Sequence, residues 1–323
     1  MNSTTPSQAF ACAPFIKEIG RGQKGARSLS RADAHAIYDA MLAGRVSDLE
    51  LGALLLAWRI KGESPEELAG FLDAAEPGYR TWDAPASAFA PVVIPSYNGA
   101  RQLPNLTPLL ALLLARSGVP VLVHGVEAMP GRVGTAEVFA HLGLAPVQNA
   151  AQAHDLWRQH QPVYIDLEHL APRLAWMLSL RKILGVRNST HTVVKLLQPF
   201  RQPALRLASY THPEYLQLLS EYFTRLAPAQ QGDVFVLRGT EGEAVASVRR
   251  AQQITWFHRG ASSVLVERAA PDDAAPELPQ RQAEACADWI AAVLADKLPV
   301  PPAIAQQVAH CQEVARGLNI VFK

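Results

Sequence analysis

The sequence predicts an α/β protein with a small all-helical domain and a larger domain in which flanking helices cover a mostly parallel central sheet. Two observations lead to this prediction. Apolar residues recur at helical spacing through the first part of the chain, whereas from about residue 91 onward short apolar strands alternate with helices. This second order is typical of a parallel sheet with crossover helices. About half of the 323 residues (49%) are apolar, so a sizeable core can form.

Three short helices are predicted in the first domain. The first runs from Asp33 to Ala43, with apolar residues at helical spacing. Ser47 and Glu50 have the spacing of a capping box at the start of the second helix. Pro65 occupies the first turn of the third helix. A bundle this small leaves apolar surface uncovered, and a second subunit would cover it.

Five short apolar strands are predicted in the second domain. They cover Val92–Ile94, Val119–His124, Val163–Leu167, Asp233–Arg238 and Ser263–Glu267. Residues 166–190 have a helical pattern, and we expect them to return to the N-terminal bundle. The predicted division is therefore a loose arm at 1–14, a helical domain at 15–88 plus about 166–190, and an α/β domain at 89–165 plus 191–323.

Cysteine spacing and hydropathy exclude several classes of protein. The three cysteines, Cys12, Cys286 and Cys311, are far apart, so no metal-binding spacing such as Cys-x-x-Cys exists. We expect neither a metal ion nor another cofactor. The longest apolar run, from Leu109 to Ala115, is far shorter than the ~20 residues that span a bilayer. The N-terminal residues lack the basic head and apolar stretch of a signal peptide. We therefore expect a cytoplasmic protein with no membrane partner.

A basic tract without acidic residues runs from Arg173 to Pro213, although the formal net charge of the chain is only +1. Its seven bases are Arg173, Arg181, Lys182, Arg187, Lys195, Arg201 and Arg206. Clustered Lys and Arg side chains neutralise phosphates and release counterions, and Asn188–His191 adds hydrogen-bond donors for phosphate oxygens. The tract predicts binding of nucleic acid, single-stranded in preference to duplex, with little sequence preference because no base-reading motif is evident. The bases that would extend this surface are Lys17, Arg21, Lys24, Arg249 and Arg250.

Four segments resemble a known family. They read IKEIGRG at 16–22, SYNGARQLPNLTPLLALLLA at 96–115, LRKILGVRNSTHT at 180–192 and LRGTEGE at 237–243. From about residue 15 to the end, the chain resembles the anthranilate phosphoribosyltransferase and nucleoside phosphorylase type II family, and in particular its divergent YbiB-type branch. The resemblance implies an anthranilate phosphoribosyltransferase-like fold and a homodimer formed through the helical domain. For this branch it also implies binding of DNA or RNA.

Two parts of the family's active site differ in this sequence. The enzymes hold phosphoribosyl pyrophosphate on a Gly-Thr-Gly-Gly-Asp turn, whose glycines let backbone N–H groups approach the phosphates. The matching residues at 96–100 read Ser-Tyr-Asn-Gly-Ala. The enzymes' Asp-Glu pair for magnesium matches 239–243, where a glycine separates two glutamates. Set against the resemblance, these differences imply a degenerate phosphoribosyl pocket with no catalytic residues and no transferase activity. Its residues are Ser96, Tyr97, Asn98, Gly99, Arg101, His124 and Gly125.

Two other functions stay open on the sequence. In the first, the protein is an enzyme whose remodelled pocket takes a different small substrate, with Arg101, His124 and Glu241 as pocket residues. In the second, it is a scaffold that binds other proteins through the helical domain. Saturable binding of phosphoribosyl pyrophosphate with magnesium would support the first function. A protein partner that survives nuclease treatment would support the second.

Overall fold

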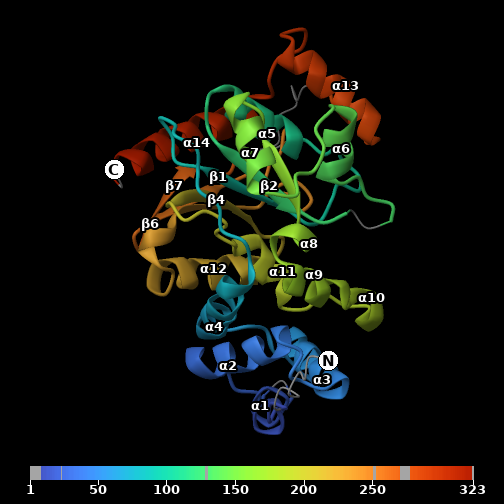
Figure 1. Ribbon diagram of the computed structural model, residues 1–323, viewed down its shortest axis with the longest axis vertical. Coiled ribbons are helices and arrows are strands. Elements are labelled where there is room, and N and C mark those ends of the chain that lie inside the picture. Colours follow the sequence, from blue (N-terminus) through green and yellow to red (C-terminus); the bar gives the residue numbers. More distant parts are fainter. Residues whose placement is uncertain (1–8, 23, 128–129, 250–251, 270–276, 322–323) are drawn as a thin grey trace, which may run out of the picture. The chain divides into compact units, whose positions relative to one another are not determined.

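The computed structural model describes residues 9–22, 24–127, 130–249, 252–269 and 277–321 (Figure 1). The chain divides into two units, each built from two separate stretches of sequence. The helical unit comprises residues 1–79 and 171–197, and the sheet unit comprises residues 80–170 and 198–323. The returning segment of the helical unit, 171–197, begins and ends later than the predicted 166–190. Most of the predicted arm lies outside the described residues.

Helices build the helical unit. Its first stretch contains α1 (Ala13–Ile19), α2 (Arg31–Leu42), α3 (Asp48–Lys61), α4 (Pro65–Ala75) and the 3₁₀ turn η1 (Glu76–Gly78). Its second stretch contains α9 (Pro172–Ser179), α10 (Arg181–Leu184), α11 (Thr190–Val193) and the 3₁₀ turn η2 (Val194–Leu196). The helix α1 is not predicted from the sequence, although Pro14 lies in its first turn, a position that proline favours.

Two capping boxes determine where α3 and α4 begin. Ser47 accepts a hydrogen bond from the N–H of Glu50, whose side chain in turn accepts one from the N–H of Ser47, as the sequence predicts. Ser64 and Glu67 make the same reciprocal pair at the start of α4. Each box satisfies backbone donors that the first turn of a helix leaves without a partner.

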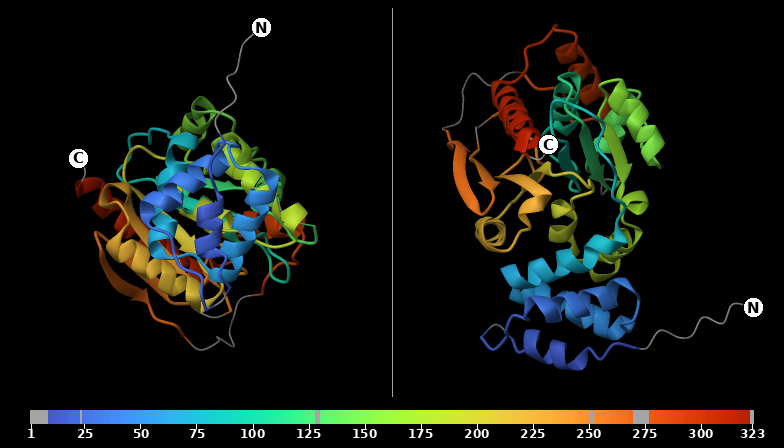
Figure 2. Two further views of the ribbon diagram at one scale, coloured as in Figure 1. Left: turned by 90° about the horizontal axis from the view of Figure 1, so that it is seen from below. Right: turned by 60° about the vertical axis from the view of Figure 1, so that its left-hand side comes forward.

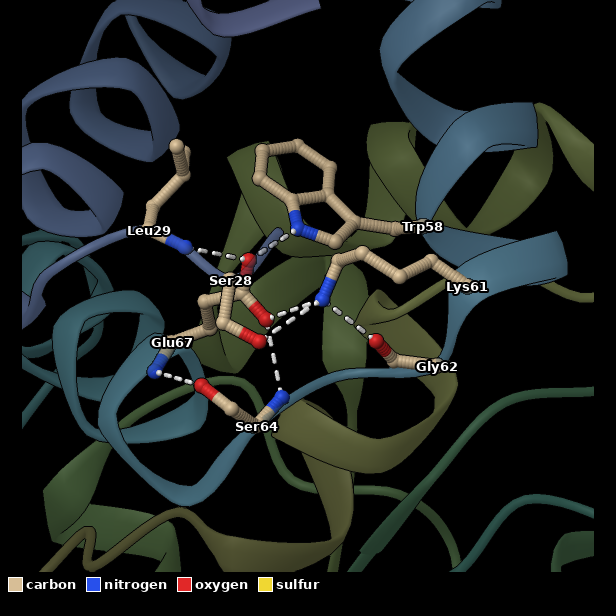
Figure 3. A network of polar contacts seen from close by, with 7 residues as sticks. All are labelled: Ser28, Leu29, Trp58, Lys61, Gly62, Ser64 and Glu67. Carbon is tan, nitrogen blue, oxygen red and sulfur yellow. Dashed lines mark hydrogen bonds and ion pairs between the residues drawn. The ribbon is translucent and has the colours of Figure 1, made fainter. Parts of the chain in front are cut away.

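The Glu67 carboxylate is completely buried and collects polar contacts from three parts of the helical unit (Figure 3). It accepts hydrogen bonds from the backbone N–H groups of Leu29 (3.0 Å) and Ser64 (2.8 Å). It also accepts them from the indole N–H of Trp58 (3.1 Å) and the ammonium of Lys61 (2.6 Å). A buried charge with this many donors links α3, α4 and the chain before α2 into one network.

Aromatic rings fill the core beside this network. Phe71 stacks on Tyr38 with 4.6 Å between ring centres, and it meets the edge of Trp58 at 4.9 Å. The buried hydroxyl of Tyr38 forms a 2.9 Å hydrogen bond with the hydroxyl of Thr190. The returning segment therefore completes the core of the N-terminal helices.

In the described part of the sheet unit, seven strands form one sheet with the order β3-β2-β1-β4-β5-β6-β7. The strands are β1 (Val92–Ser96), β2 (Val121–Gly125), β3 (Val163–Asp166), β4 (Ala204–Ser209), β5 (Gly232–Leu237), β6 (Ile254–His258) and β7 (Ala261–Val266). The pairs from β3 to β5 are parallel, and β6 and β7 form an antiparallel hairpin at one edge, orange in Figure 2. The predicted mostly parallel sheet is confirmed, although β4 and β6 are not predicted from the sequence.

Helices cover the sheet on both faces. One apolar cluster joins the strands to α5 (Thr107–Arg116), α6 (Thr135–His141), α13 (Ala283–Leu294) and α14 (Pro302–Val321). On the other face, Phe223 of α12 (Pro213–Arg225) lies 5.5 Å from Phe257 of β6. The remaining helical segments are α7 (Ala150–Arg158), α8 (Leu167–Leu170) and the 3₁₀ turn η3 (Ala229–Gln231). Within the described ranges, no helix has the length and apolar character needed to cross a membrane.

Candidate polyanion site and phosphate loop

The returning segment of the helical unit carries five bases of the predicted tract. They lie on α9 (Arg173), on α10 (Arg181 and Lys182), in the following loop (Arg187) and on η2 (Lys195). Gly185 ends α10 with a φ of +72°, which glycine adopts without steric cost, and so turns the chain toward α11. Arg173 and Lys182 are exposed and the other three bases are half-buried. The segment contains no acidic residue.

Three of these bases act on one histidine. Burial is the largest cause that lowers the pKa of His191 to about 3, and the positive charges of Arg187, Arg181 and Lys195 add to it. The N–H of Asn188 donates a 3.2 Å hydrogen bond to Nδ1 of this ring. Like charges nearby disfavour the protonated ring, so the contributions of these three bases, beside that of burial, place them close enough to His191 to act on it together. The fold therefore brings together bases that are spread over 15 positions of the sequence.

Apolar side chains are exposed among these bases. Ile183 is 82% exposed, Trp176 is 40% exposed and Val186 is 37% exposed. Exposed aromatic side chains among Lys and Arg residues are what single-stranded nucleic acid uses for stacking. Trp176 and Ile183 are not predicted from the sequence. Their signal is weak, because short helices such as α10 show too little periodicity to separate a buried face from an exposed one.

Two bases of the predicted tract belong to the sheet unit. Arg206 is only 2% exposed in β4, where its Nη1–H donates to the side chain of Gln231 (3.0 Å) and its guanidinium lies 5.8 Å from the centre of the Phe223 ring. The prediction that Arg206 contacts nucleic acid is therefore wrong. Arg206 lies in a buried strand, where its side chain points toward α12. Arg201 forms an ion pair with Asp83 (2.7 Å) at the surface.

The bases predicted to extend the site fall in different places. Lys17 and Lys24 are exposed in the helical unit, on α1 and in the loop after it. Arg21 pairs with Glu18 (2.5 Å) and also donates to the carbonyl of Lys17 (3.2 Å), so its charge is already partly compensated. Arg249 is exposed in the sheet unit. The predicted contact at Arg250 lies outside the described residues.

The loop after β1 directs its backbone N–H groups toward two carboxylates of the same chain. Oε1 of Glu243 accepts hydrogen bonds from the N–H groups of Asn98 (2.9 Å) and Gly99 (2.8 Å). The carboxylate of Glu241 accepts hydrogen bonds from three successive N–H groups further along the loop. They are those of Arg101 (2.7 Å), Gln102 (3.0 and 3.1 Å) and Leu103 (3.3 Å). Amides that match the phosphate turn of the resembled enzymes are therefore hydrogen-bonded within the chain.

Tyr97, in the loop after β1, and His124, on β2, lie against each other. The Tyr97 hydroxyl lies 2.5 Å from Nδ1 of His124, and the two rings meet edge to face at 5.4 Å. Desolvation lowers the pKa of His124 to about 3 and raises the pKa of Tyr97 well above its usual value. A Cβ at Gly125 would lie 2.1 Å from the carbonyl oxygen of Ser96, so only glycine fits here. The structure thus brings predicted pocket residues of β1, β2 and the loop after β1 together, with the side chains of Tyr97 and His124 in direct contact.

The buried His124 predicts a specific loss of stability in acid. A histidine in the unfolded chain has a pKa near 6.5, so below this pH the unfolded state binds a proton that the folded state does not bind until about pH 3. The free energy of unfolding should therefore be unaffected by this group above about pH 6.5 and should fall by about 1.4 kcal/mol per pH unit well below it. Urea unfolding of His124→Asn should be compared with that of wild type between about pH 6 and pH 5. The free energy of unfolding should fall less steeply with decreasing pH in the variant, because about one proton fewer is taken up on unfolding. An unchanged slope would contradict the buried, neutral state of this ring.

The sheet unit also offers a cavity beside the loop. Its volume is about 590 Å³, and it is lined by Gln102–Pro104, Arg249 and Leu278–Gln282. Nη1–H of Arg281 donates to the carbonyl of Arg101 (2.9 Å) at its border. Across the described ranges, no group of three His, Cys, Asp or Glu side chains is arranged to hold a metal ion. The carboxylates of the 239–243 segment hold backbone amides instead.

Comparisons with known proteins agree with this architecture. Residues 13–75 match the helical bundle domain of the glycosyl transferase family. The chain is 44% identical over 300 residues to the uncharacterized protein YbiB of Escherichia coli (strain K12), covering 92% of each chain. It is 33% identical over 238 residues to an anthranilate phosphoribosyltransferase of Methylobacterium radiotolerans, covering 73% of this chain and 67% of that enzyme.

Solved structures of anthranilate phosphoribosyltransferases share the fold. The enzyme of Thermus thermophilus superposes with a TM-score of 0.66 at 23% identity, covering 95% of this chain and 88% of that one. The enzyme of Saccharomyces cerevisiae in complex with PRPP and Mg gives a TM-score of 0.68 at 15% identity, covering 97% and 89%. At these identities the likeness concerns the fold alone.

Proposed function

Because the chain belongs to the YbiB-type branch of the anthranilate phosphoribosyltransferase family, we propose that it uses the phosphoribosyltransferase scaffold to bind single-stranded nucleic acid. The observation that carries this proposal is the grouping of Arg181, Lys182, Arg187 and Lys195 on α10, the following loop and η2 of one acid-free segment, which creates a positive potential. Phosphate groups supply the negative charge that such a potential attracts. The ligand is DNA or RNA, bound by phosphate clamping and not by catalysis.

The surroundings of these bases suit a single strand. Exposed Trp176 and Ile183 lie on the same returning segment and offer an aromatic and an aliphatic surface to unpaired bases. Contacts of charge and stacking do not distinguish one base from another, so little sequence preference follows. The location that we propose with this ligand is the cytoplasm, where the buried free cysteines Cys12, Cys286 and Cys311 would stay reduced.

The alternative of an enzyme with a remodelled pocket has less support. Such an enzyme would hold the phosphates of its substrate on the backbone amides of the loop after β1. Those of Asn98, Gly99 and Arg101 already donate to Glu243 and Glu241. The transferase reaction is therefore not part of the proposal.

The proposal is tested by fluorescence anisotropy with a labelled single-stranded oligonucleotide at a low and a high salt concentration. Each phosphate contacted by a cation adds about −0.7 to the slope of log K against log salt for a single strand. If the five bases of the returning segment each reach a phosphate, the slope is about −3.5. Affinity that does not change with salt would contradict the proposal. Binding of phosphoribosyl pyrophosphate in its place would favour the enzyme.

We also propose that two copies of the chain associate through α3. Leu49, Leu56 and Ile60 lie on one face of this helix at spacings of seven and four, and they are 85%, 47% and 61% exposed. A large apolar stripe on a surface helix indicates a surface that another protein covers. The same stripe on a second copy supplies a matching apolar face, as a symmetric dimer requires.

The variant Leu56→Glu/Ile60→Glu should convert a dimer into a monomer, because two carboxylates would be desolvated in the contact. Sedimentation velocity measures the change in mass. Ile183→Glu is the control, since Ile183 is also apolar and exposed but lies on α10. A wild-type monomer, or a double variant that stays dimeric, would contradict association through α3.

A further inference from the structure

The loop after β1 has the construction of an anion site. Five of its backbone N–H groups, between Asn98 and Leu103, point at carboxylate oxygens over distances of 2.7–3.3 Å. Successive N–H groups that converge in this way form a concave site for anions such as phosphate and carboxylate. Here the anions are the side chains of Glu243 and Glu241, which arrive from a turn more than 130 residues further along the chain.

The turn that carries the two glutamates is firmly placed. Gly242 has a φ of +92°, and a Cβ there would lie 2.2 Å from Nδ2 of Asn98. Its carbonyl accepts hydrogen bonds from Nδ2 of Asn98 (2.8 Å) and from the hydroxyl of Ser209 (2.6 Å). Glu241 adopts a φ of +53°, which is unfavourable for a residue with a side chain. The hydrogen bonds to the loop offset this strain.

The two glutamates differ in how accessible they are. Glu243 is only 1% exposed, and among the described residues its Oε2 has no hydrogen-bond partner. Glu241 is half-buried, and the N–H groups of Arg101 and Gln102 that it binds belong to exposed residues. Removing Glu241 would therefore open its amides to solvent, whereas removing Glu243 would leave donors buried without acceptors.

We infer that Glu241 and Glu243 are internal anions that occupy a phosphate-binding loop, so that the chain keeps this loop closed to free phosphates and diphosphates. The inference does not depend on nucleic-acid binding, which involves other residues. The ligand class of the opened loop is a small phosphate or diphosphate, because three N–H groups at 2.7–3.3 Å from Glu241 match the acceptors of one phosphate group.

The test compares wild type with Glu241→Ala, using inorganic pyrophosphate without metal as the ligand. Thermal unfolding and isothermal titration calorimetry are measured in potassium chloride of matched ionic strength, which controls for screening. Glu241→Ala is expected to unfold at a lower temperature than wild type, to regain much of the loss when pyrophosphate is added, and to bind pyrophosphate at least tenfold more tightly. Amide resonances of Arg101, Gln102 and Leu103 should shift on titration in the variant and stay unchanged in wild type.

Two further variants keep the inference open to contradiction. Glu313→Ala removes one carboxylate from an exposed site, so it reports any gain in pyrophosphate binding that comes from net charge alone. Glu241→Gln keeps the side chain's size and replaces a charged acceptor by a neutral one, which serves if Glu241→Ala does not fold. The inference is overturned if neither Glu241 variant binds pyrophosphate more tightly than wild type and Glu313→Ala. It is also overturned if wild type binds pyrophosphate through the same amides.

Discussion

Replacing Arg181 and Lys182 together by glutamate is expected to weaken binding of a single-stranded oligonucleotide by about two orders of magnitude at low salt. Both side chains lie on α10, next to the exposed Ile183, and among the described residues neither forms an ion pair. The exchange removes two phosphate contacts and adds two repulsive charges. The slope of log K against log salt should become shallower by about 1.4.

A matched control separates a local contact from a change in net charge. Arg158→Glu/Lys297→Glu alters the net charge by the same amount at exposed positions of the sheet unit. It should retain nearly all of the affinity and the salt slope. Equal losses in the two double variants would show that the protein attracts nucleic acid by its overall charge, and the site would then not be on the returning segment. Circular dichroism and thermal unfolding should show that both variants fold.

The variant Glu67→Ala is expected to lose about 3–5 kcal/mol of unfolding free energy. The carboxylate is completely buried, and its removal strands the ammonium of Lys61, which is itself almost buried, together with the indole N–H of Trp58. It also removes the acceptor of the Leu29 N–H and half of the capping box of α4. Removing one member of a buried charge network costs more free energy than the intact network contributes. The remaining polar groups stay buried and lose their partner.

Urea unfolding followed by tryptophan fluorescence measures this loss, since Trp58 lies within the network. Glu67→Gln should lose less than Glu67→Ala, because its amide oxygen still accepts hydrogen bonds. Glu76→Ala, an exposed carboxylate at the end of α4, serves as the control and should change the unfolding free energy by less than about 0.5 kcal/mol. A loss below about 1 kcal/mol in Glu67→Ala would mean that the network adds little to stability.

Local patterns predict much of the fold. The capping signature of Ser47 and Glu50 is seen as predicted, and continuous apolar runs identify strands such as Val92–Ile94, which lies within β1. The strand β4 escapes prediction because Arg206 interrupts its apolar run, and only the packing of Phe223 and Gln231 shows why an arginine can be buried there. Burial of a charged residue depends on tertiary partners, which spacing along the chain does not reveal.

The candidate sites are harder to predict from the sequence. The acid-free tract is visible in the sequence, but its common effect on His191 requires the folded arrangement of α10, α11 and η2. The glutamates of the 239–243 segment illustrate the same limit. The sequence shows that two glutamates separated by a glycine, Glu241 and Glu243, replace the adjacent metal-binding pair of the enzymes. Their hydrogen bonds to Arg101 and Gly99, however, join residues 140 and 144 positions apart. No local pattern encodes such a pairing.

The helical unit is assembled from two stretches of chain, and this affects the order of events during synthesis. Its N-terminal helices emerge first, but Thr190, the partner of the Tyr38 hydroxyl, is made about 110 residues after the first stretch ends at Tyr79. At about 5–20 residues per second, the nascent helices wait for roughly 6–22 s before their core can close. Throughout that interval their apolar faces are open to chaperones and to other nascent chains.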